Sequence, residues 1–123
     1  MILIIGAAAS GKRAFAETLG YAPADMADAC LDDRPVLFNL QEMVWRDPGH
    51  ADELLPLLLE KEAVLCDEVG SGVIPVIGND AAARRAVGKL CILLAQKATC
   101  VVRLVCGIPT VIKGVLPQLE STD

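Results

Sequence analysis

The chain has 123 residues, a length typical of one domain, and a formal net charge of −5 at pH 7. This acidic balance argues against nonspecific nucleic-acid binding, which needs a basic surface, and no apolar run is long enough to cross a bilayer. Hydrophobic residues make up 54% of the sequence and aromatic residues 3%, which favours an aliphatic parallel sheet packed between helices.

The first expected elements are a strand at residues 2–5, a glycine-rich loop, and a helix that ends near Leu19. The loop has the Gly-x-x-x-x-Gly-Lys frame of a phosphate-binding loop, in the strand–loop–helix context that this motif requires. We expect its backbone N–H groups to cradle the phosphates of a nucleotide while Lys12 reaches the terminal phosphate oxygens. The candidate nucleotide-binding residues of the loop are Gly6, Ala8, Ala9, Ser10, Gly11, Lys12 and Arg13.

Arg13 departs from the motif, because Ser or Thr normally occupies this position and holds magnesium through its hydroxyl. A guanidinium still attracts phosphate. The sequence therefore predicts nucleotide binding with a weakened magnesium site. A tight structural turn before a helix is the alternative interpretation.

The next segment, residues 21–34, is polar and predicts a connection that contains one short helical turn. An apolar run at residues 35–40 has strand character, and residues 41–46 begin a helix. After a break at residues 47–49, the leucine spacing predicts a helix over residues 51–61, with Pro56 in its first turn or at a kink.

A second apolar run, residues 63–66, ends in the adjacent acids Asp67 and Glu68. This pattern is typical of a buried strand that delivers a carboxylate to the sheet edge beside a phosphate loop. We expect Asp67 or Glu68 to hold magnesium and to act with Lys12 in phosphoryl transfer. The alternative is a strand that simply ends in polar surface residues.

The remaining sequence predicts a glycine-rich loop at residues 69–75, either a mobile lid near the ligand or an irregular connection. Asn79 can cap a following helix, on which Arg84 is either a phosphate or ligand contact or a solvated side chain. The last expected elements are this helix (residues 80–97), a long strand (99–106), an edge strand (110–113) and a loosely held tail (114–123).

The five cysteines lack Cys-x-x-Cys spacing and lie mostly in apolar runs, which indicates small buried hydrophobic residues in a reducing compartment. A zinc site is not expected, since His50 is the single imidazole in the sequence. Met1 leads into an apolar run without a basic segment, so we expect no signal peptide and a cytoplasmic location.

Together these elements predict an α/β fold with three layers, in which helices flank a mainly parallel sheet of about five strands. We expect a P-loop NTPase-like fold in which residues 1–123 form a single nucleotide-binding domain.

Four segments of the chain also carry a family resemblance. They are the phosphate loop continued by Phe15-Ala16-Glu17, the segment at residues 68–75, the pair Arg84 and Gly88, and Gly107-Ile108-Pro109 with Lys113. They resemble the Gly-Gly-Ala-Arg-Ser-Gly-Lys-Ser start, the Asn-Glu-Val-Gly-x-Gly-x-x-Pro loop, the Arg-Asp-x-x-Gly helix and the Gly-Ile-Pro ending of one family. That family is adenosylcobinamide kinase/adenosylcobinamide-phosphate guanylyltransferase.

The resemblance implies a role in cobalamin (corrinoid) biosynthesis: GTP- or ATP-dependent phosphorylation of the adenosylcobinamide hydroxyl with Mg²⁺, then GMP transfer through a guanylylated histidine. It implies a homotrimer and a corrinoid as partner. In this chain Lys12 would stabilise the transferring phosphate, and Asp67 or Glu68 would hold magnesium or orient the hydroxyl.

Several family positions differ in this chain. No residue matches the family histidine, because His50 follows the wrong strand, so we expect the guanylyltransferase step to be lost. Ala9 and Arg13 replace the family's arginine and serine, and Asn39 stands where an acidic residue is expected. The alternative is therefore a catalytically degenerate nucleotide-binding, regulatory or assembly protein of the same fold.

Overall fold

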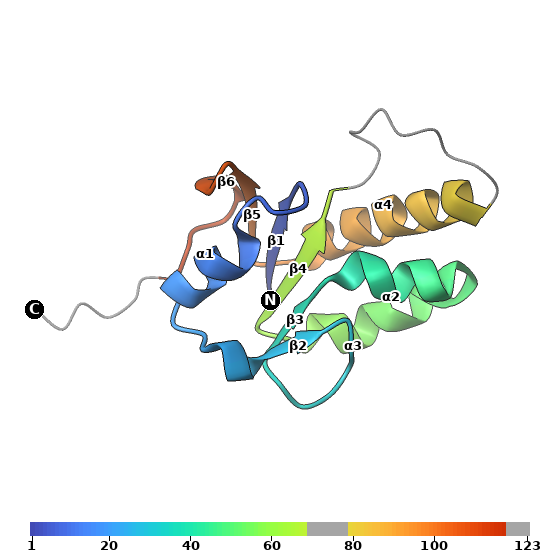
Figure 1. Ribbon diagram of the computed structural model, residues 1–123, viewed down its shortest axis with the longest axis horizontal. Coiled ribbons are helices and arrows are strands. Elements are labelled where there is room, and N and C mark those ends of the chain that lie inside the picture. Colours follow the sequence, from blue (N-terminus) through green and yellow to red (C-terminus); the bar gives the residue numbers. More distant parts are fainter. Residues whose placement is uncertain (69–78, 118–123) are drawn as a thin grey trace, which may run out of the picture.

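The computed structural model describes residues 1–68 and 79–117, and these residues form one six-stranded sheet with helices on both faces (Figure 1). The strands are β1 (Ile2–Gly6), β2 (Met26–Asp28), β3 (Val36–Phe38), β4 (Ala63–Asp67), β5 (Cys100–Val105) and β6 (Ile108–Lys113). The α-helices are α1 (Lys12–Thr18), α2 (Leu40–Arg46), α3 (Leu55–Leu59) and α4 (Asn79–Lys97), with 3₁₀ segments η1 (Pro23–Asp25) and η2 (Pro48–Leu54).

The sheet has the strand order β2-β3-β4-β1-β5-β6, and β6 alone among the described strands runs antiparallel to its neighbour. The central strand β1 pairs in parallel with β4 on one side and β5 on the other. Ile2, Leu3 and Ile4 are all buried, because helices cover both faces at this point. The predicted α/β class, with a mainly parallel sheet and flanking helices, is confirmed.

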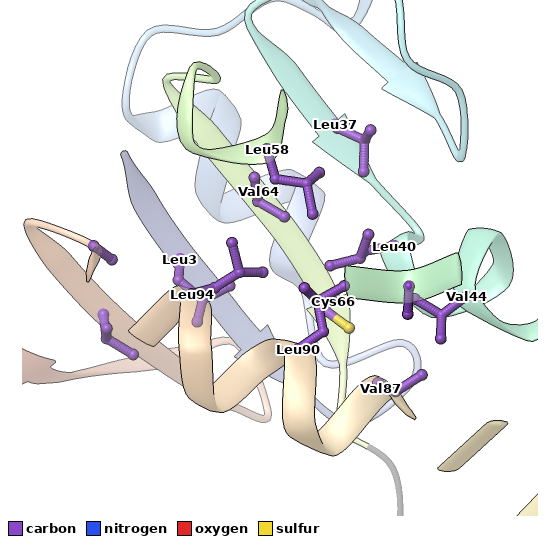
Figure 2. Close-up of a cluster of buried hydrophobic side chains, with 13 residues drawn as sticks. Leu3, Leu37, Leu40, Val44, Leu58, Val64, Cys66, Val87, Leu90 and Leu94 are labelled. Atoms are coloured by element: carbon purple, nitrogen blue, oxygen red, sulfur yellow. The ribbon is translucent and has the colours of Figure 1, made fainter. Parts of the chain in front are cut away.

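Alternate residues of each strand supply two hydrophobic clusters, one on each face of the sheet. On one face α2, η2, α3 and α4 pack on the sheet, and Figure 2 shows leucines and valines of these helices meeting the strands. On the other face α1 packs on the sheet through Phe15 and Ala16, and Leu19, which follows the helix, packs there as well. The three-layer arrangement follows from this alternation, because successive side chains of a strand point to opposite faces.

The helix that follows β1 lies on one face of the sheet, and the helices that follow β3 and β4 in the sequence lie on the other face. The connection after β1 forms α1, whereas those after β3 and β4 lead to α2 and α4. In parallel sheets a crevice opens at the carboxyl ends of the strands where the connections diverge in this way. The loop that joins β1 to α1 lies at this crevice.

The sheet has one strand more than expected, because the connection at residues 21–34 contains β2 as well as the expected helical turn, η1. Strand β2 has only three residues, Met26, Ala27 and Asp28, and they pair with β3 at the sheet edge. A segment this short has no periodicity of its own, so its pairing with β3 decides its structure.

The helix expected over residues 51–61 is wrong in its bounds. The 3₁₀ segment η2 precedes α3, in which Pro56 occupies the expected first-turn position. Because Pro56 has no N–H group, it cannot continue the hydrogen bonds of the preceding segment, and the α-helix begins at Leu55 instead.

Strand β6 is the last strand among the described residues and is longer than the expected residues 110–113. All of its residues are exposed, while the Lys113 Nζ donates to the carbonyl oxygens of Ala95 (3.0 Å) and Gln96 (2.8 Å) in the last turn of α4. Of the expected tail, Leu116 packs against the α1 face of the core. Residues 118–123 and the expected loop at residues 69–75 lie outside the described residues. Among the described helices, none combines the length and apolar character needed to span a membrane.

Candidate phosphate-binding site

The loop between β1 and α1 curls tightly because its residues adopt conformations that few side chains allow. Ala9 has a φ angle of 58° and Gly11 one of 94°, both in the left-handed region. At Gly6 a Cβ atom would lie 2.4 Å from Ser10 Oγ and 2.7 Å from the Leu104 carbonyl oxygen, so a side chain cannot fit there. The geometry of the loop therefore explains why both positions of the motif are glycine.

Lys12 begins α1, and its side chain folds back into the loop, so that the residue is only 9% exposed. Its Nζ donates to the carbonyl oxygens of Ala7 (2.7 Å) and Gly6 (3.2 Å) and lies 3.5 Å from Ser10 Oγ. It also forms an ion pair with Asp67, with 2.7 Å between Nζ and Oδ1. The ammonium group is thus held by several oxygens of the chain.

Asp67, the last residue of β4, connects this lysine to a row of polar groups along the carboxyl ends of the strands. The Asp67 backbone N–H donates to Gln41 Oε1 (3.0 Å), and Gln41 Nε2 donates to Asn39 Oδ1 (3.3 Å). Asn39 Nδ2 in turn donates to Asp28 Oδ1 (2.8 Å) at the end of β2. These hydrogen bonds fix Asp67 opposite the loop.

A cavity of about 480 Å³ opens beside Lys12, in the size range of small-molecule sites. Its walls are residues 8–14, Phe38 and Asn39 at the end of β3, and Leu65 and Asp67 of β4. Arg13 lies at the rim, where its guanidinium carbon is 4.8 Å from the centroid of the Phe38 ring. This cation–π contact holds the guanidinium on the ring.

Glu68 directly follows Asp67 but has a different partner and faces a different hollow. Its two carboxylate oxygens accept hydrogen bonds from Arg103 of β5, from Nε at 2.7 Å and from Nη2 at 3.0 Å, and this pairing raises the pKa of Arg103. The pair borders a hollow of about 280 Å³ together with residues 7–10 and 104–106.

The structure therefore brings together part of the expected site. Residues 8–13 and Asp67 line the larger of these two hollows. Gly6 does not line it, Glu68 pairs with Arg103, and the half-buried Arg84 of α4 does not line that cavity either. Asp67 and Glu68 do not converge on a common point. Within residues 1–68 and 79–117, no three His, Cys, Asp or Glu side chains are grouped as metal ligands.

The polar row formed by Asp28, Asn39 and Gln41 was not expected from the sequence as part of the site. Asn39 has a φ angle of 57° at the start of α2. An asparagine between an apolar run and a helix is a usual signal for this left-handed conformation, since its side chain tolerates it. The sequence contains this signal, but the hydrogen bond to Asp28 depends on β2.

The fold and the site define the chain as an α/β protein with a glycine-bounded loop, a buried lysine and an aspartate at the carboxyl edge of a parallel sheet. A comparison with models of known protein families gives no match, and a search of curated proteins gives no relative.

Proposed function

We propose that this chain binds the phosphates of a nucleoside triphosphate, GTP or ATP, in the cavity beside Lys12. The observation that carries the proposal is a buried ammonium group on the wall of a cavity bounded by a loop with left-handed residues. Backbone N–H groups of such loops form concave sites for anions. Arg13 at the rim adds a second positive charge.

Binding would exchange the partners of Lys12 rather than move the loop as a whole. The Lys12 Nζ has Asp67 and two carbonyl oxygens as partners. Phosphate oxygens are also hydrogen-bond acceptors, and a triphosphate carries more negative charge than these partners together. A lysine ammonium is suited to this exchange because it is a point charge on a flexible stem. Release of Asp67 is therefore the expected cost of binding.

The residues present fit a magnesium site poorly, so we propose nucleotide binding that depends little on Mg²⁺. Position 13 offers a guanidinium in place of a hydroxyl, Asp67 is paired with Lys12, and Glu68 is paired with Arg103. Among the described residues, Asp67 is the single carboxylate that lines the cavity, and the hydroxyl ligand of the motif is missing at position 13.

The resemblance described above suggests adenosylcobinamide phosphorylation in corrinoid biosynthesis as the activity, without the guanylyltransferase step. In that activity Lys12 stabilises the transferring phosphate and Asp67, once released, orients the acceptor hydroxyl. A catalytically degenerate nucleotide-binding or regulatory protein is the second candidate. Two features favour it. The Lys12–Asp67 ion pair occupies the carboxylate that phosphoryl transfer would use for the metal, and Arg13 stands where the motif has a hydroxyl.

Calorimetry with GTP, ATP and cobinamide, each with Mg²⁺ and with EDTA, tests these proposals together with a turnover assay. Nucleotide binding that is weakened in Lys12→Ala but not in Lys61→Ala supports the proposed site. Lys61 is a suitable control because its ammonium also contacts backbone oxygens, at the opposite end of the strands. Product formation on addition of cobinamide supports the kinase, and binding without product supports the second candidate. Absence of binding by either nucleotide overturns both.

We also propose that the chain is a cytoplasmic homo-oligomer, a trimer by resemblance. The support is the exposed edge strand β6, where Ile108, Val111 and Ile112 are exposed apolar residues. Such an edge is open to pairing with another chain. Light scattering coupled to size exclusion measures the assembly, and a monomer at micromolar concentration would contradict it.

A further inference from the structure

Two of the five cysteines contact each other in the core, outside the phosphate-binding cavity. Cys66 on β4 and Cys91 on α4 have their Sγ atoms 3.7 Å apart. Figure 2 shows Cys66 among the side chains that join β4 to α4, beside Leu90. A disulfide has an S–S distance near 2.05 Å, so closure needs the two sulfur atoms to approach by roughly 1.7 Å.

The two thiols differ in burial and in acidity. Cys66 is fully buried, whereas Cys91 is partly exposed. The hydrogen bond that they share lowers the pKa of Cys91. Cys91 is therefore the thiol more readily present as the reactive thiolate.

We propose that Cys66 and Cys91 are a reversibly oxidised pair that forms a disulfide between β4 and α4 when a hydroperoxide reaches Cys91. In the first step the Cys91 thiolate attacks a peroxide oxygen, so that an S–O bond forms and the O–O bond breaks. The leaving hydroxide, or the alkoxide of an organic hydroperoxide, takes up a proton and becomes water or an alcohol. Cys91 is then a sulfenic acid.

In the second step Cys66 attacks the sulfur of the sulfenic acid. The S–S bond forms, the S–O bond breaks, and the second oxygen leaves as water with the proton of Cys66. The two thiols together give two electrons to one hydroperoxide, and a dithiol reductant reverses the bridge by exchange. Reversible bridges of this kind are compatible with a reducing compartment.

The position of the bridge places it next to the proposed phosphate site. Cys66 directly precedes Asp67, and its Sγ lies 3.4 Å from the Asp67 carbonyl oxygen. Cys66 points to the α4 face of the sheet and belongs to that hydrophobic cluster, while Asp67 lines the cavity on the α1 side. The pair does not touch the cavity, so its oxidation is measured without reference to nucleotide binding.

Peptide mapping tests the proposal, because trypsin places each of the five cysteines on a different peptide. The folded chain is treated with a small excess of hydrogen peroxide, its free thiols are blocked, and it is digested without reduction. We expect residues 62–84 linked to residues 90–97, two hydrogen masses below the sum of the free peptides. The link should exceed other cysteine pairings by about tenfold, since the contact supplies proximity, and should disappear after dithiol treatment.

Matched variants separate the pair from general oxidation. Cys66→Ser should leave Cys91 as a sulfenic acid that a dimedone probe captures, and Cys106→Ser, at an exposed cysteine, should leave the link unchanged. Circular dichroism shows whether each variant is folded. The proposal is overturned if Cys66 and Cys91 stay fully alkylatable while Cys30 or Cys106 is oxidised. It is equally overturned if the link forms as readily in the urea-unfolded chain.

Discussion

Two ion pairs flank the loop between β1 and α1. Their cations differ in exposure and in hydrogen bonding more than their carboxylates do. The carboxylates of Asp67 and Glu68 have similar exposure, 23% and 20%. Lys12 is 9% exposed and divides its hydrogen bonds among several oxygens, whereas Arg103 is 50% exposed and gives both of its bonds to Glu68. Neighbouring acids in the sequence therefore face cations of different kinds.

This difference separates a site that can exchange partners from one that holds a structure. A lysine ammonium can leave one oxygen for another without losing geometry, but an arginine fork matches a single carboxylate in two bonds. The pair of Lys12 and Asp67 is therefore suited to accept a phosphate, and the pair of Arg103 and Glu68 to join β5 to the end of β4.

The largest effect is expected for Lys12→Met, which keeps the apolar stem and removes the charge. Nucleotide affinity should fall by about tenfold or more, because one charge-assisted contact of roughly 1.5 kcal/mol or more is lost. The free energy of unfolding should fall by about 2 kcal/mol, since Asp67 and the Gly6 and Ala7 carbonyls lose their donor. Calorimetry and urea unfolding measure the two effects, with Lys61→Met as the control. An unchanged affinity in a folded Lys12→Met chain would place the ligand elsewhere.

The second effect distinguishes the two acids. Asp67→Asn should raise nucleotide affinity by about fivefold, because roughly 1 kcal/mol of competing attraction for Lys12 is removed. Glu68→Gln should change the affinity by less than about twofold, since its partner lies outside the cavity. If Asp67 instead takes part in phosphoryl transfer, Asp67→Asn lowers turnover while binding improves. Equal effects of both substitutions would contradict the separation of the two pairs.

The third effect concerns the metal. Arg13→Ser restores the hydroxyl of the motif and removes a cation, so binding in EDTA should weaken by about threefold. Addition of Mg²⁺ should then recover affinity in the variant more than in the parent chain. Titrations with and without Mg²⁺ give both ratios, and Arg85→Ser, at an exposed arginine of α4, is the control. A parent chain that binds only with Mg²⁺ would be inconsistent with the proposed role of Arg13.

The smallest effect is expected at the outer pair. A double-mutant cycle of Arg103→Gln and Glu68→Gln should give a coupling free energy below about 1 kcal/mol, because the arginine is half exposed. The coupling should decrease further in salt, which screens exposed charges. Urea unfolding of the four chains measures it. A larger coupling than at Lys12 and Asp67 would reverse the comparison.

Much of the fold could be predicted, because the central strands and α4 are long enough to show their own patterns. Residues 2–5 and 63–66 are apolar runs, and the structure places them side by side in register. Strand β2 could not be predicted, since Met26–Asp28 becomes a strand by pairing with β3. The break between η2 and α3, which falls just before Pro56, could not be predicted either. These elements depend on tertiary contacts and on a missing N–H group.

The position of the candidate site could be predicted from the glycine frame and from the acids after β4. The sequence could not show that Lys12 folds back onto the Gly6 and Ala7 carbonyls, since this depends on the curvature of the loop. It also could not assign Asp67 and Glu68 to different cations, because the strand order decides which residue faces Arg103.

The turn between β5 and β6 contacts the loop between β1 and α1. The Gly107 N–H donates to the Ser10 carbonyl oxygen at 2.9 Å, and a Cβ at Gly11 would lie 3.3 Å from the Gly107 Cα. Any displacement of this hairpin tip must therefore shift the Ser10 carbonyl or break that bond. A molecule that binds β6 and displaces this turn would therefore also move the loop between β1 and α1. A change in the conformation of that loop would in the same way move the edge of the sheet at β6.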